Sequence, residues 1–124
     1  MKTIKNSILI IATGVSILIA SSLKAQDNNL KKMAYIAYLS SSVKMWKSVE
    51  AKAREQYEAN PNNFQMLLKL TEIQYGLLNA CLANKSEDTH KKYLKMAEKN
   101  VDTLLHYNKK WSAAHALKAG ILSS

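Results

Sequence analysis

The fold is decided by residues 63–83, which read NFQMLLKLTEIQYGLLNACLA. On a helix that turns about 100° per residue, the polar and small positions of this segment share one narrow arc: Gln65, Lys69, Glu72, Gly76 and Asn79. The remaining arc of about 240° is apolar, interrupted by Thr71 and Gln74. Because such a helix must pack against neighbours on several sides, residues 63–83 are predicted to be the central helix of the domain.

The flanking segments also favour helices, because alanine, leucine, lysine, methionine and glutamate are abundant and glycine and proline are rare. The apolar spacing predicts helices near residues 29–40, 41–59, 63–83, 88–107 and 112–122. Pro61 marks the clearest stop, since it moves the preceding residue out of helical backbone conformation. Asn62 and Gln65 are spaced as a capping box for the central helix. The three serines at 40–42 favour either a bend or a turn between the first two helices.

Length and composition favour a single all-α domain. The chain has 124 residues and a formal net charge of +9, with only 3 glycines, 1 proline and 1 cysteine. These numbers argue against collagen-like, turn-rich all-β and low-complexity chains, and one cysteine cannot form an intramolecular disulfide. An apolar content of 48% is too high for a disordered chain of this charge. Cys81 lies among leucines and is expected to be a buried thiol.

Residues 1–25 have the order of a bacterial secretory signal peptide: a basic start, an apolar stretch over residues 8–20 and a small, polar end. Cleavage is expected after Ala25, with Ser22 as the alternative; an uncleaved membrane anchor is the other interpretation. Removal of residues 1–25 takes away three lysines and no acid, which lowers the formal charge from +9 to +6. The domain, residues 26–124, is therefore expected in the periplasm or cell envelope, or secreted.

A weak repeat connects the two halves of the domain. The helix end around Ala53 and the turn at Asn60–Asn63 match the helix end around Val101 and the turn at Asn108. With Pro61 eight residues after Ala53, and Leu67, Leu70 and Thr71 as a large, large and small set, the chain resembles the tetratricopeptide-repeat (TPR) proteins. It departs from the family at Gln74, at Lys109 and in its longer repeat spacing. The resemblance implies antiparallel helix pairs stacked as a short right-handed solenoid.

The last helix, near residues 112–122, is apolar on two sides. Trp111, Leu117 and Ile121 form one stripe, and small residues form a second. A terminal helix of a solenoid should present a polar face to water. The first stripe is therefore predicted to be a self-association surface, covered by a second copy or by further repeats of a longer protein.

No catalytic or cofactor-binding motif is present. Asp102 and His106 are four residues apart, which predicts a solvated pair rather than a metal site. The lysines of residues 91–99 are diluted by acids, and Tyr93 and Tyr107 are expected on the core side, so a nucleic-acid partner is not predicted. The basic charge leaves contact with an anionic envelope surface open.

The sequence as a whole therefore predicts an exported, non-catalytic scaffold without a cofactor, which binds a protein or peptide. By the TPR resemblance, contact residues come from the first helix of each pair: Tyr35, Tyr38, Gln65, Lys69, Glu72 and Asn79. The alternative is a structural, self-associating envelope subunit, in which the last helix forms the interface and no binding groove is needed.

Overall fold

The computed structural model describes residues 28–124, and these are helical apart from short turns. The chain divides into two compact units, Met1–Lys32 and Met33–Ser124. The predicted signal peptide and its cleavage site fall on residues outside the described part. Of the first unit, residues 28–32 are described and are helical; the second unit carries everything discussed below.

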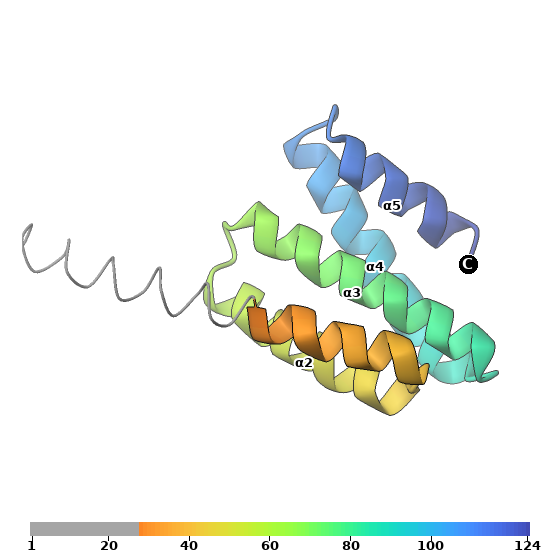
Figure 1. Cartoon of the computed structure of the whole chain (residues 1–124). Helices are drawn as coiled ribbons and strands as arrows, with labels where there is room; N and C mark the ends of the chain where they lie inside the picture. Colours follow the sequence, from red (N-terminus) through yellow and green to blue (C-terminus); the bar gives the residue numbers. More distant parts are fainter. Residues whose placement is uncertain (1–27) are drawn as a thin grey trace, which may run out of the picture. The chain divides into compact units, whose positions relative to one another are not determined.

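Four labelled helices follow the helix that covers residues 28–40. They are α2 (Val43–Ala59), α3 (Phe64–Ala83), α4 (Glu87–Tyr107) and α5 (Ser112–Leu122). Successive helices run in alternating directions and are joined by tight turns (Figure 1). The class predicted from the sequence, all-α, is confirmed for the described residues.

The serine segment is a turn. Ser41 has a positive φ of 50°, and its amide donates to the carbonyl of Tyr38. Ser42 then begins α2, because its hydroxyl accepts a hydrogen bond from the Met45 amide. Asn84, at the end of α3, donates from Nδ2 to the carbonyls of both Ser41 and Ala80, at 2.8 Å each. The turn is thereby fixed to the end of the central helix.

Helix α3 lies at the centre, as its wide apolar arc predicts. It contacts α2, α4 and α5. By contrast, the backbone of α2 does not come close to that of α4 or α5. Nine of its side chains are buried: Leu67, Leu70, Thr71, Ile73, Gln74, Leu77, Leu78, Ala80 and Cys81. The α2 side of this core depends on Gly76, because a β-carbon there would lie within 2.9 Å of ring atoms of Trp46.

The beginning of α3 differs from the expected capping box. Asn63, not Asn62, is the N-cap, and its Oδ1 accepts a hydrogen bond from the Met66 amide at 3.1 Å. The reason is the turn after Pro61, in which the Asn63 amide donates to the Asn60 carbonyl. That turn occupies Asn62 and delays the first helical residue to Phe64.

Candidate binding surface

The exposed ridge of α3 consists of Gln65, Glu72 and Asn79. All three are exposed on a helix that is otherwise largely buried. Residues seven apart on a straight helix are displaced by only about 20° around its axis, so the three side chains form one row. Lys69 lies on the same arc but is half-buried. The row presents an amide, a carboxylate and a second amide over about 20 Å of helix length.

The two predicted tyrosines of the first helix are also exposed. Tyr35 is 62% exposed and Tyr38 is 70% exposed, with the apolar Leu39 beside them at 63%. Within the described residues, no hydrogen bond, ion pair or ring contact joins either tyrosine to the row on α3. The structure therefore gives two separate exposed features, a polar row on α3 and an aromatic face on residues 35–39.

The stripe predicted for self-association is not an exposed surface. Leu117 is 9% exposed and Ile121 is 1% exposed, because α5 packs against both α3 and α4 of the same chain. This corrects the expectation that a second copy covers them. Trp111 is half-buried and belongs to a different feature at the start of α5.

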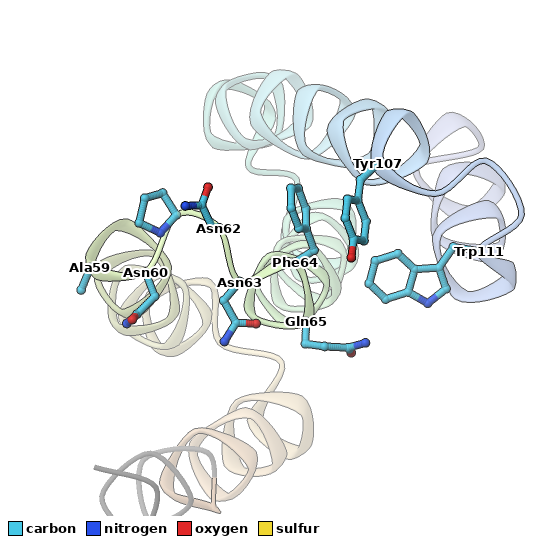
Figure 2. Close-up of a pocket in the computed structure, with 9 residues that line it drawn as sticks. Ala59, Asn60, Asn62, Asn63, Phe64, Gln65, Tyr107 and Trp111 are labelled. Atoms are coloured by element: carbon cyan, nitrogen blue, oxygen red, sulfur yellow. The ribbon is translucent and has the colours of Figure 1, made fainter. Parts of the chain in front are cut away.

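That feature is an open groove where the turn before α3 meets the end of α4 and the start of α5. Its volume is about 670 Å³, and Phe64, Tyr107 and Trp111 supply its aromatic lining. Phe64 and Tyr107 are stacked with ring centroids 3.9 Å apart and planes 7° from parallel. Trp111 meets Tyr107 edge-on at 6.3 Å. Figure 2 shows three asparagines on one side of Phe64 and the other two rings on the opposite side.

Tyr107 was wrongly predicted to face the core: it is 59% exposed. It occupies the last position of α4, where the helix extends past the buried layer. A sequence signal did exist, because aromatic residues stand at the three helix ends that form the groove: Phe64 opens α3, Tyr107 ends α4 and Trp111 precedes α5. What the sequence does not show is that these junctions meet at one end of the domain.

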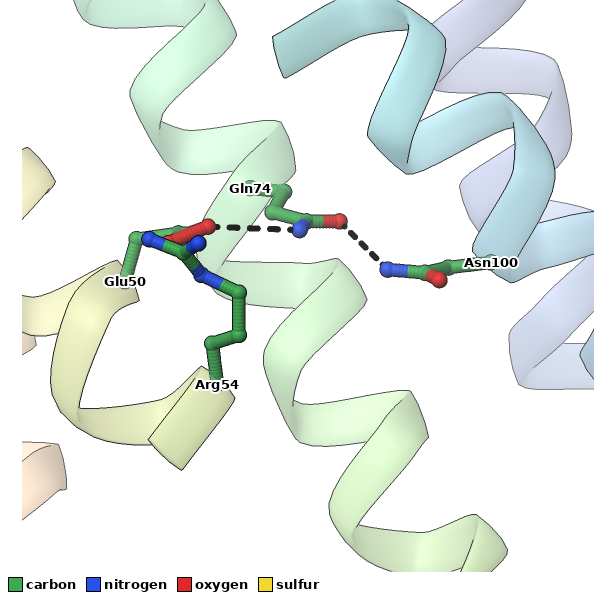
Figure 3. Close-up of polar contacts among 4 residues, drawn as sticks. All are labelled: Glu50, Arg54, Gln74 and Asn100. Carbon is green, nitrogen blue, oxygen red and sulfur yellow. Dashed lines mark hydrogen bonds and ion pairs between the residues drawn. The ribbon is translucent and has the colours of Figure 1, made fainter. Parts of the chain in front are cut away.

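A buried polar chain fixes the helices behind these surfaces (Figure 3). Glu50 on α2 is fully buried and accepts from Arg54 Nε at 2.9 Å. Gln74 on α3 donates to Glu50 at 3.4 Å, and Asn100 on α4 donates to Gln74 at 2.9 Å. Gln74, which interrupts the apolar arc in the sequence, is thus the side chain that links α2 to α4.

Two buried groups near this chain of polar side chains have shifted pKa values. Burial raises the pKa of the Tyr93 hydroxyl, and the Glu50 carboxylate raises it further. Burial likewise raises the pKa of the Cys81 thiol, against a smaller opposing effect of Lys47. Both groups therefore stay protonated at neutral pH and act as packing residues.

The predicted pairing of Asp102 with His106 is replaced by another. Asp102 lies 3.5 Å from the ammonium nitrogen of Lys118 on α5, and both side chains are well exposed. Within residues 28–124, no group of three or more histidine, cysteine or acidic side chains could hold a metal ion. No helix of this part of the chain is long and apolar enough to cross a membrane.

Comparison with known proteins gives no relative. No protein-family model matches the chain, and no curated protein or solved structure matches it.

Proposed function

We propose that this protein is an exported, non-catalytic, TPR-like scaffold that binds a protein or peptide through its helical surface. The observation that carries the proposal is the row of Gln65, Glu72 and Asn79 on α3. Helix α3 buries nine side chains, yet Gln65, Glu72 and Asn79, seven residues apart on one side of it, stay exposed to water. Exposed rows on the first helix of each pair are how helical repeats present binding residues.

The packing order supports a repeat arrangement. Each of α3 and α4 contacts its successor, and α5 also contacts α3, the helix two before it. In stacked helix pairs, the first helix of one pair lies against both helices of the preceding pair, which is the relation of α5 to α3 and α4. The helical residues 33–40 and α2 would form the first pair, and α3 and α4 the second.

Export is supported by the basic, apolar and small-polar order of residues 1–25. Expression of all 124 residues with a C-terminal tag should yield a protein whose intact mass corresponds to a chain that begins at Gln26. If cleavage follows Ser22, the mass should correspond to a chain that begins at Leu23. Retention of Met1 in the membrane fraction would contradict export by a cleaved signal and favour an anchor.

The binding surface is tested by a charge-matched pair of double variants. Lys69→Ala/Glu72→Ala alters the row on α3, whereas Lys95→Ala/Glu98→Ala removes the same two charges at the same spacing from the outer face of α4. Affinity capture from the envelope fraction of the native host, read by mass spectrometry, should lose its specific partner with the first variant only. Equal capture by both variants, with unchanged helical circular dichroism, would reject the row as the binding surface.

A further inference from the structure

The groove at the turn end of the domain lies outside the proposed scaffold surface, apart from Gln65, which begins the α3 row and also lines the groove. Its nine lining residues include no charged side chain. Four of them are primary amides: Asn60, Asn62, Asn63 and Gln65. Its volume falls within the range of about 300–1,000 Å³ found for small-molecule sites.

The amides retain unused hydrogen-bonding capacity of both kinds. Asn63 Oδ1 already accepts the capping hydrogen bond from the Met66 amide, which leaves the Asn63 NH2 group free to donate. Asn60 donates Nδ2 to the Gln56 carbonyl at 3.4 Å, which leaves its Oδ1 free to accept. The side chains of Asn62 and Gln65 make no hydrogen bond within the described residues. The groove therefore offers uncharged donors and acceptors next to aromatic rings.

Part of the groove wall is held in place before any ligand binds. Stacking fixes Phe64 against Tyr107, and the capping bond fixes Asn63. The turn between α4 and α5 is tied twice: the Lys110 amide donates to Asn108 Oδ1, and His115 Nε2 lies 2.6 Å from the Lys109 carbonyl oxygen. These fixed parts of the wall lose little conformational freedom on binding.

We infer that this groove binds a neutral saccharide. Hydroxyl groups donate and accept at the same time, so a sugar can satisfy free amide oxygens and free amide nitrogens together. The weakly polar C–H face of a pyranose ring packs on aromatic side chains such as Trp111. An anionic ligand would find no cation in the lining, and an oligoproline segment, which has no backbone N–H, could not donate to the free oxygens of Asn60 and Asn62.

Indole nitrogen signals test the inference directly, because the chain has two tryptophans in different environments. Trp46 is buried between α2 and α3, and Trp111 lines the groove. The ¹⁵N-labelled protein, purified after expression of all 124 residues, is titrated with tetra-N-acetylchitotetraose and, separately, cellotetraose to about 10 mM, a range that covers weak binding. The Trp111 signal, assigned with Trp111→Phe, should move with at least one of them, and the Trp46 signal should stay.

Matched variants locate the effect. Gln65→Ala should weaken binding about fivefold or more, as expected for losing a hydrogen-bonding amide. Lys95→Ala, an exposed position on the outer face of α4 that belongs neither to the groove nor to the α3 row, should leave the saccharide affinity unchanged. No movement of the Trp111 signal with either saccharide would overturn the inference. Equal weakening in both variants would overturn it as well, as would movement of the Trp111 signal only in a parallel titration with an oligoproline peptide. None of these results bears on protein capture by Lys69 and Glu72, so the two proposals fail independently.

Discussion

Replacement of Gly76 by alanine brings two effects of opposite sign into competition. Gly76 is in the interior of α3, where alanine should favour the helix by about 1 kcal/mol. The added methyl group, however, would overlap the Trp46 ring, with Cζ3 at 2.6 Å and Cζ2 at 2.9 Å from the ideal β-carbon position. Trp46 is 8% exposed, so its ring cannot swing into water without giving up buried area.

The steric effect should win. Overpacking of a close-packed core costs about 1–3 kcal/mol, and the clash involves a rigid ring, so the upper part of that range applies. After subtracting the helix-propensity gain, the Gly76→Ala variant should be about 1–2 kcal/mol less stable than the wild type. For a domain of this size, that lowers Tm by about 5–10 °C.

Urea unfolding followed by far-UV circular dichroism gives the free energy of unfolding of both proteins. Trp46→Leu/Gly76→Ala is the matched control, because in the Trp46→Leu background the alanine should no longer be destabilising. If Gly76→Ala alone raises the urea midpoint, helix propensity has won and the close packing of α2 on α3 is refuted.

Two further changes follow from buried groups. Arg54→Met should lower the free energy of unfolding by about 2 kcal/mol, less than breaking a fully buried pair, because Arg54 is 38% exposed. In a Glu50→Gln background the same substitution should lower it by at least about 1 kcal/mol less. Equal losses in both backgrounds, measured by urea unfolding, would show that the pair is not coupled. Because the pKa values of Cys81 and Tyr93 are raised on folding, their contribution to stability is complete below their ordinary values of 9.0 and 10.0 and is lost as pH rises through the folded-state values. The urea midpoint should therefore fall above about pH 9, and Tyr93→Phe should flatten the decline above about pH 10; an unchanged slope would contradict this.

The helices were predictable from the sequence because their signals are local. The apolar girth of residues 63–83 requires neighbours on several sides, and the structure supplies α2, α4 and α5. Gln74 was recognisable as an interruption of that arc. Its function in joining Glu50 to Asn100 was not, because those residues lie 24 and 26 positions away in the sequence.

The surfaces were harder to predict because periodicity shows that a helix face is apolar but not what covers it. The stripe of Leu117 and Ile121 looked like an interface with another molecule, yet α3 and α4 of the same chain cover it. The opposite error occurred at Tyr107, whose position on the apolar arc of α4 suggested burial although the core ends before it. Both outcomes depend on how the helices are placed in space.

The mass of the purified protein in solution, measured by light scattering over a range of concentrations, tests the central claim most directly. A scaffold whose last helix is covered by its own chain should be a monomer at every concentration, with the α3 row free to bind a partner. A stable dimer or larger species would contradict this account, and would instead assign the protein to the self-associating envelope subunits.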